Sequence, residues 1–134
     1  MKKTLISVLS VLLLLTNAAQ AESSVACAYM LLRVYHAELD YCRVKLPKDR
    51  EDRYQRLRAG MEKFIRENAR NDPELMIAGI ADNEKRAISL LKTCQSDDFK
   101  LARQAMDELL TPMNEQLVNE NLSYKRNPQS GTCG

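Results

Sequence analysis

The sequence has little of the material from which catalytic and cofactor-binding motifs are built. It contains a single histidine, His36, and only four glycines. It lacks the Gly-x-Ser-x-Gly turn of a nucleophilic serine and any glycine-rich loop that could hold phosphate. The Cys-x-x-Cys pairs of zinc sites and the Cys-x-x-Cys-His motif of covalent haem are missing too. We therefore expect no enzyme, no catalytic residue and no metal site.

Non-covalent haem deserves separate consideration, because small exported helical bundles can carry it. It would need His36 and a methionine as axial ligands. The methionines fall in apolar stripes, where a flexible thioether simply fills core space. They are Met30, Met61, Met76, Met106 and Met113. We expect no cofactor, and a catalytic or pH-sensing role for His36 is left as a minor alternative.

Signals for β-structure are nearly absent as well, which favours an all-α fold. The chain has no alternating apolar and polar runs and no Asn-Gly or Asp-Gly hairpin turn. Apolar residues instead recur at helical spacing in four segments. These segments are 24–46, 49–70, 72–94 and 96–117. Four amphipathic helices joined by short links predict an antiparallel four-helix bundle.

The ends of these helices carry recognisable signals. Asp49, with Asp52 three residues later, suits the start of the second helix. Asp72 before Pro73 suits the third, and Ser96 suits the fourth. In the last segment, Pro112 should kink the helix or end it near Leu110, and coil is expected from about residue 122.

The first 21 residues have the pattern of a cleaved secretory signal peptide. Lys2 and Lys3 precede an apolar run from Leu5 to Leu15, and Ala19-Gln20-Ala21 fits the cleavage rule. We expect a periplasmic or secreted protein without stable membrane insertion. Residues 22–122 should then form one helical domain, followed by a tail at 123–134.

The four cysteines test this topology. Cys27 and Cys42 lie on one predicted helix, about 22 Å apart at ~1.5 Å per residue, too far for a disulfide. In an up-down-up-down bundle, Cys42 and Cys94 come to one end, and Cys27 and Cys133 come to the other. We therefore prefer the pairs Cys42–Cys94 and Cys27–Cys133, with the second one tying the tail back.

Charge is the one global signal that could concern function. Without the two signal lysines the chain has equal numbers of basic and acidic residues, so nothing indicates nucleic acid. Residues 43–70 are nevertheless basic, and residues 72–120 are acidic. The simpler interpretation is attraction between neighbouring helices. The alternative is a partner-binding face made of Arg50, Arg53, Arg56, Arg58 and Arg66.

Small size, expected disulfides and missing catalytic motifs predict a non-enzymatic protein that binds another protein. In composition the chain resembles small exported helical proteins of bacteria, including periplasmic immunity proteins against secreted cell-wall toxins. That resemblance implies an inhibitor or immunity factor. A periplasmic stress or chaperone-like factor is the alternative, and a small enzyme comes third. Assembly into a homo-oligomer stays open.

Overall fold

The computed structural model describes residues 23–133, and these form an all-helical domain. The expected signal peptide, residues 1–21, lies outside the described part of the chain. The helices are α2 (Val25–Tyr41), α3 (Lys48–Asn68), α4 (Pro73–Leu90), α5 (Asp97–Leu109) and α6 (Pro112–Leu122).

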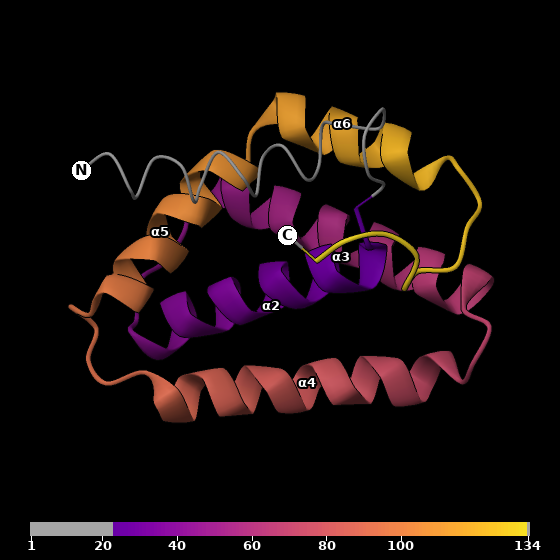
Figure 1. The fold of residues 1–134 in the computed structure, drawn as a ribbon. Helices are drawn as coiled ribbons and strands as arrows, with labels where there is room; N and C mark the ends of the chain where they lie inside the picture. Colours follow the sequence, from indigo (N-terminus) through magenta and orange to yellow (C-terminus); the bar gives the residue numbers. More distant parts are fainter. Residues whose placement is uncertain (1–22, 134) are drawn as a thin grey trace.

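Helix α2 is the central element of the fold, because α3, α4 and α5 all pack against it. Figure 1 shows that α3 runs back against the direction of α2, α4 reverses again, and α5 and α6 return together as the fourth leg. The predicted antiparallel four-helix bundle is confirmed, with its fourth member divided in two.

Pro112 explains the division of the fourth leg. Helix α5 ends at Leu109, and α6 begins at Pro112, where the missing N–H costs nothing. The Thr111 hydroxyl caps the new helix by accepting from the Asn114 amide at 3.3 Å. The chain then changes direction, so that α6 packs on α3. The predicted end near Leu110 is confirmed.

Helix α2 stops earlier than predicted. It ends at Tyr41 instead of continuing to Leu46. The Val44 amide donates to the Leu39 carbonyl at 2.9 Å, while Arg43 adopts a left-handed conformation with φ of 57°. This is a Schellman ending, in which the last carbonyls are satisfied by the turn. The prediction was wrong because Val44 and Leu46 pack against the core from a loop, which prolongs the apolar pattern.

Of the other predicted helix caps, two are present and one is not. Asp72 accepts from the amides of Glu74 and Leu75, and Ser96 accepts from that of Phe99, as predicted. Helix α3, however, begins at Lys48 after Pro47, without a side-chain cap. Asp49 therefore lies within the first turn, where its charge favours the helix dipole but its side chain caps nothing.

The core is contributed unequally by the helices. Helices α2, α3 and α5 each bury several large side chains, and α6 adds Val118. Helix α4 fully buries only Ile80 and covers the core with half-buried residues. The central cluster includes Tyr29, Leu32, Leu39, Tyr54, Leu57, Met61, Phe64, Ile65, Phe99 and Met106. Helix α4 is thus the most peripheral leg of the bundle.

Both predicted disulfides are present. The Cα atoms of Cys42 and Cys94 are 5.6 Å apart, which ties the end of α2 to the segment after α4. The Cα atoms of Cys27 and Cys133 are 5.4 Å apart, which ties the first turn of α2 to the end of the chain. Each end of the central helix is therefore cross-linked to a segment distant in sequence.

The tail does more than carry a cysteine. Its Pro128 carbonyl accepts from the Ala26 amide at 2.9 Å, and its Thr132 carbonyl accepts from the Ser24 amide at 3.0 Å. These amides belong to the start of α2, where a helix has N–H groups without partners of its own. Gly131, with φ of 107°, makes the turn that brings Thr132 into place. The tail thus completes the N-terminus of α2.

We predict that Cys133→Ser frees the Cys27 thiol and loosens the last dozen residues. Loss of the cross-link should lower the free energy of unfolding by ~2–4 kcal/mol. The Ser24 and Ala26 amides should exchange hydrogen faster, as measured by hydrogen exchange with mass spectrometry. The double variant Cys27→Ser/Cys133→Ser is the control. Unchanged exchange at Ser24 and Ala26 would show that the tail holds its place without the bridge.

We further predict that Arg43→Gly stabilises the protein by about 0.5–1 kcal/mol, because glycine adopts the left-handed conformation without a Cβ penalty. Lys45→Gly, in the same loop but without a positive φ, should instead destabilise it. Urea unfolding of the two variants measures both effects. Equal loss of stability in both would contradict the strain at Arg43.

Candidate functional site

A polar cleft opens where α3 and α4 separate over α2. Its volume is about 550 Å³. Helices α2 and α3 each supply residues spaced by three and four, which places them on one face of the helix. From α2 these are Arg33, His36, Ala37 and Asp40, and from α3 they are Glu51, Tyr54, Gln55 and Arg58. The loop residues 44–46 close one end, and Glu84 of α4 forms the opposite wall.

His36 is held tightly within this cleft. Its ring stacks on that of Tyr54, with centroids 3.7 Å apart and planes within 3°. Its Nε2 lies 2.9 Å and 3.2 Å from the two carboxylate oxygens of Glu51. Because a carboxylate only accepts, Nε2 carries the proton and donates it. The stacking and the hydrogen bond together fix the orientation of the imidazole.

The Glu51 carboxylate accepts hydrogen bonds from two neighbours in the cleft. Burial alone would raise the pKa of Glu51, but hydrogen bonds from His36 and Gln55 outweigh burial and hold this pKa below its usual value. The Gln55 amide donates to Glu51 Oε1 at 2.8 Å. Glu51 is therefore an ionised carboxylate in the folded protein at neutral pH, and its oxygens are already occupied.

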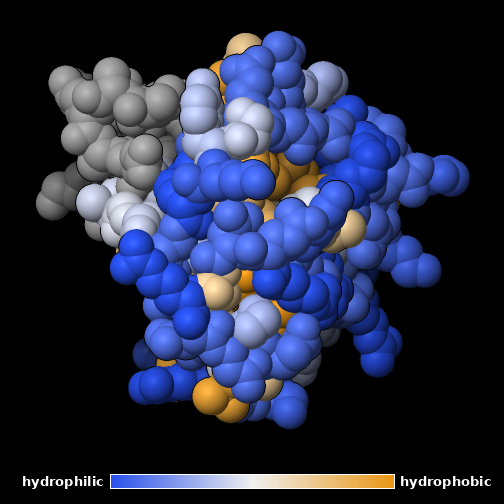
Figure 2. Space-filling view, turned by 90° about the vertical axis from the view of Figure 1, so that its right-hand side faces the viewer, coloured by the Kyte–Doolittle hydropathy of each residue, from blue (hydrophilic) through white to orange (hydrophobic). Residues whose placement is uncertain are grey.

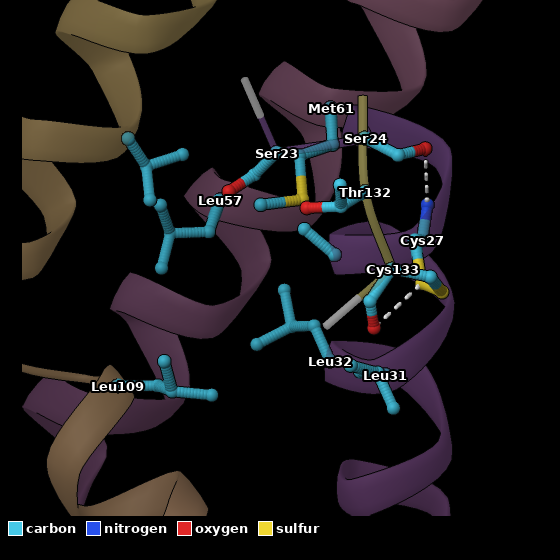
Figure 3. Close-up of a pocket in the computed structure, with 12 residues that line it drawn as sticks. Ser23, Ser24, Cys27, Leu31, Leu32, Leu57, Met61, Leu109, Thr132 and Cys133 are labelled. Atoms are coloured by element: carbon cyan, nitrogen blue, oxygen red, sulfur yellow. Dashed lines mark hydrogen bonds between the residues drawn. A yellow bond between two sulfur atoms is a disulfide. The ribbon is translucent and has the colours of Figure 1, made fainter. Parts of the chain in front are cut away.

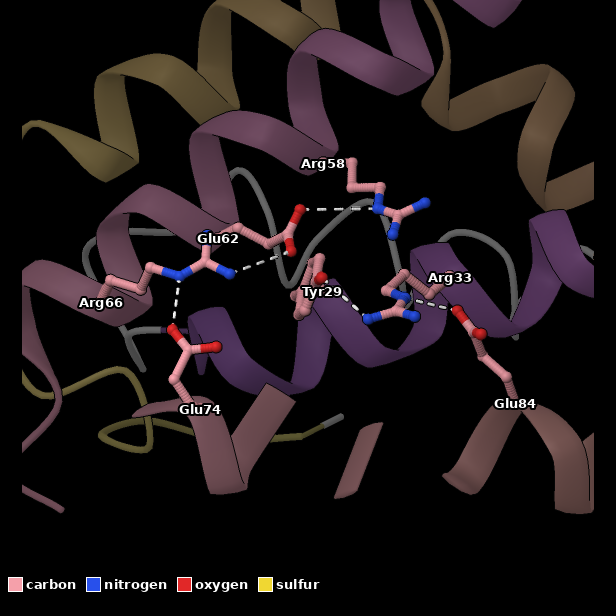
Figure 4. A network of polar contacts seen from close by, with 7 residues as sticks. All are labelled: Tyr29, Arg33, Arg58, Glu62, Arg66, Glu74 and Glu84. Carbon is pink, nitrogen blue, oxygen red and sulfur yellow. Dashed lines mark hydrogen bonds and ion pairs between the residues drawn. The ribbon is translucent and has the colours of Figure 1, made fainter. Parts of the chain in front are cut away.

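A second charge pair lies deeper between α2 and α4. The buried Arg33 guanidinium donates to Glu84 through Nε and to the Tyr29 hydroxyl through Nη1, the latter at 3.0 Å (Figure 4). Burial would lower the pKa of Arg33, but these contacts raise it above its ordinary value. Burial also raises the pKa of the neighbouring Tyr54 to about 12, so that its hydroxyl stays neutral.

The ion pairs continue along α3. Arg58 Nε lies 3.5 Å from Glu62, and Arg66 bridges Glu62 at 3.7 Å and Glu74 of α4 at 2.7 Å. In Figure 4 these side chains line up between α3 and α4 on the same side of α2 as Arg33. An ion pair thus attaches the start of α4 to α3.

The five arginines predicted as a partner-binding face do not lie on one face of the molecule. Arg50 pairs with Asp107 of α5, and Arg56 pairs with Glu115 of α6 at 2.9 Å. Arg53 donates to the Leu110 carbonyl at 2.9 Å. Arg66 reaches Glu74 of α4, whereas Arg58 pairs with Glu62 of its own helix. Contacts between neighbouring helices are therefore present for the other four arginines, and the role of all five in binding a partner stays a prediction.

The Arg56–Glu115 contact shows how the arginines that face α5 and α6 hold these helices. Two parallel hydrogen bonds, of 2.9 Å and 3.0 Å, join the guanidinium to the carboxylate. This fork holds the pKa of Glu115 below its usual value. Together with Arg53, the fork secures α6 on α3.

Sequence reasoning singled out His36 and, among the predicted partner-binding arginines, Arg58, but missed the rest of the cleft. The partner of His36 comes from another helix, 15 residues away, so no local spacing reveals it. One signal was available. Arg33, His36 and Asp40 form a polar stripe on a helix whose remaining residues are mostly apolar, and such a stripe must face water or polar groups.

The cleft offers charge and shape rather than a reactive nucleophile. Its lining residues include no serine, threonine or cysteine. The Glu51–His36 pair resembles the orienting half of a catalytic triad, but the lining provides no serine, threonine or cysteine for it to activate. Among residues 23–133 no cluster of three or more histidine, cysteine, aspartate or glutamate side chains is arranged to hold a metal ion. The lining residues can form hydrogen bonds and ion pairs with a ligand.

A second cavity lies beneath the tail and is apolar. Leu31, Leu32, Leu57, Met61 and Leu109 line it, and the tail residues Thr132 and Cys133 cover it (Figure 3). Its volume of about 40 Å³ has room for one or two water molecules at ~30 Å³ each. The buried Ser23 hydroxyl, which has no hydrogen-bond partner in the described chain, borders this cavity. The space is too small for an organic ligand.

A third feature is a pair of acids between α2 and α5. The Glu38 side chain is 7% exposed and lies beside Asp98, in a cavity bordered by Tyr35, Leu90 and Leu101. Burial, with repulsion from Asp98 added to it, raises the pKa of Glu38 to about 7. This carboxyl is therefore costly to ionise where it stands.

Large apolar side chains are exposed only at scattered positions. They are Tyr41, Leu75, Leu90, Met113 and Tyr124, which belong to α2, α4, α6 and the chain after α6. On the face shown in Figure 2, apolar side chains form small areas between hydrophilic ones. None of the described helices is long and apolar enough to cross a membrane. The polar cleft, rather than an apolar patch, is thus the candidate binding site on the described surface.

We predict that Glu38→Gln removes a pH dependence of stability between pH 4.5 and 7. Below pH 4.5 the carboxyl is protonated both in the folded and in the unfolded chain. As pH rises, the unfolded chain ionises first, so the wild type loses stability on the order of 1–3 kcal/mol by pH 7. Urea unfolding at pH 4.5, 6 and 8 measures this loss.

Two variants serve as comparisons. Asp98→Asn should flatten the pH dependence in part, because it removes the repelling charge. Asp82→Asn, at an exposed position of α4, should leave it unchanged. If Glu38→Gln keeps the slope of the wild type, the carboxyl does not titrate in this way.

Comparison of the chain with models of protein families, with curated proteins and with solved structures gave no match. What the protein does is therefore argued from the cleft and the elements that hold it.

Proposed function

We propose that the protein is an exported, non-enzymatic binding protein that acts through contact with another protein, as an inhibitor or immunity factor. The observation that carries the proposal is the cleft over α2, which is polar, open and already organised. Its volume of about 550 Å³ falls within the ~300–1,000 Å³ typical of small-molecule pockets, which is room for a few side chains. A surface loop of a partner could place two or three side chains in it.

Preorganisation supports recognition, because a site that is already ordered loses less entropy on binding. The Cys42–Cys94 disulfide fixes the end of α2 beside the loop that closes the cleft. Stacking on Tyr54 and the hydrogen bond to Glu51 fix His36. The cleft therefore presents a defined pattern of charges rather than a set of mobile side chains.

Export belongs to the same proposal. Two disulfides braced across the fold are typical of proteins in oxidising compartments and unusual in the cytosol. The N-terminal pattern of a signal peptide points the same way. We place the protein in a periplasm or outside the cell.

A chaperone-like stress factor remains the alternative, but the described surface gives it less support. Such a factor exposes a continuous apolar surface when it is activated. The exposed apolar residues here are dispersed, with Leu75 and Leu90 at opposite ends of α4.

The test is capture of partners by the oxidised protein, residues 22–134, from the envelope and the culture supernatant of its own organism. We expect one partner in a stoichiometric complex, measured by quantitative mass spectrometry and then by calorimetry with the purified partner. Reduced and alkylated protein is the control and should lose the partner. Many weakly held clients would favour the chaperone alternative, and turnover of a substrate would favour an enzyme.

A further inference from the structure

We propose that the cleft receives an acidic segment of the partner protein, a short run of aspartate or glutamate side chains, and that Arg58 and Lys45 are its main anchors. This inference rests on the proposed function and adds the chemistry of the partner. It follows from which charges of the cleft already have partners inside the molecule and which do not.

The acidic side chains of the cleft are largely occupied. Both oxygens of Glu51 lie within 3.2 Å of His36 Nε2, and one of them also accepts from Gln55. Glu84 is paired with the buried Arg33. A basic ligand would have to displace these internal partners, and that would leave Arg33 buried without a counter-charge, which is costly. Of the three acids that line the described cleft, only the exposed Asp40 has no ion pair.

The basic side chains of the cleft are less committed. The closest carboxylate oxygen to Arg58 is that of Glu62, at 3.5 Å, and the Arg58 side chain is 36% exposed. Lys45 is exposed at the closed end of the cleft and has no ion pair in the described chain. Of the cations that line the cleft, only Arg33 is buried and closely paired. Lys45 and the loosely held Arg58 therefore outnumber Asp40, the one carboxylate of the lining without an ion pair.

The geometry of these cations suits carboxylates. A guanidinium binds a carboxylate through two parallel hydrogen bonds, whereas a lysine ammonium acts as a point charge that tolerates several positions. Arg58 stands on α3 and Lys45 on the loop, so one extended segment that enters the cleft can reach both. The cleft favours protein over nucleic acid, because the rings of Tyr54 and His36 stack on each other and the covered Tyr54 ring cannot stack on a base.

The experiment measures binding of a fluorescein-labelled hexaglutamate peptide by anisotropy at low and at physiological ionic strength. We expect saturable binding that weakens with salt. The double variant Arg58→Glu/Lys45→Glu should weaken it at least tenfold. The matched control Lys100→Glu/Arg103→Glu changes the net charge equally at exposed positions of α5 and should have an effect below twofold. Circular dichroism and a count of free thiols establish that both variants are folded.

Several results would overturn the inference. Equal weakening by the two double variants would show that only net charge matters. Equal or tighter binding of a labelled hexalysine peptide would show that the cleft prefers cations, and tighter binding of a labelled ten-residue oligothymidylate would point to nucleic acid. If Arg58→Glu/Lys45→Glu fails to fold, the neutral pair Arg58→Gln/Lys45→Gln answers the same question, with an expected loss of at least threefold.

The same variants separate this inference from the proposed function. If the captured partner binds Arg58→Glu/Lys45→Glu as tightly as wild type, the protein still binds a partner, but not through an acidic segment in this cleft. If no partner is captured while hexaglutamate binding depends on Arg58 and Lys45, the cleft is an acid-binding site and the proposed function fails.

Discussion

The structure depends on the burial of α2 and on the covalent fixing of its two ends. This helix supplies much of the core and touches three of the other four helices. The Cys27–Cys133 bridge joins its first turn to the end of the chain, and the Cys42–Cys94 bridge joins its last residues to the segment after α4. Because these cross-links close long loops, they chiefly restrict the unfolded chain, and they do so at both ends of the most buried element.

The cleft is a consequence of this arrangement. Helix α4 buries little apolar surface of its own and is retained by packing on α2, by ion pairs and by the nearby disulfide. It therefore need not close against α3 along its whole length. The polar stripe of α2 at Arg33, His36 and Asp40 lies where the two helices separate, and their charges are met by Glu51 and Glu84. A less buried α4 thus leaves room for the cleft, while the core around Tyr54 and Leu39 stays closed.

Charge performs two different tasks in this molecule. On the side of α5 and α6, arginines of α3 are joined to acids of the fourth leg, as in the fork between Arg56 and Glu115. Such exposed pairs each contribute little to stability, but they join helices that are distant in sequence. On the side of α4, Arg33 and Arg66 are paired closely with Glu84 and Glu74. Arg58 has only the 3.5 Å contact with Glu62, and exposed Lys45 has no ion pair in the described chain. The second side is where we place recognition.

The sequence by itself determined the all-helical fold, most of the helix ends and both disulfides. Apolar periodicity, Asp72, Ser96 and Pro112 act locally, and the rise of a helix excludes a Cys27–Cys42 bridge. Tertiary structure alone decided where α2 stops, because Leu46 packs from a loop as well as it would from a helix. It also decided the cleft. His36 contacts Glu51, and Arg33 contacts Glu84, between different helices, and no spacing in the sequence predicts these contacts. Local patterns fix elements, but the distribution of charge between partners and solvent depends on how those elements pack.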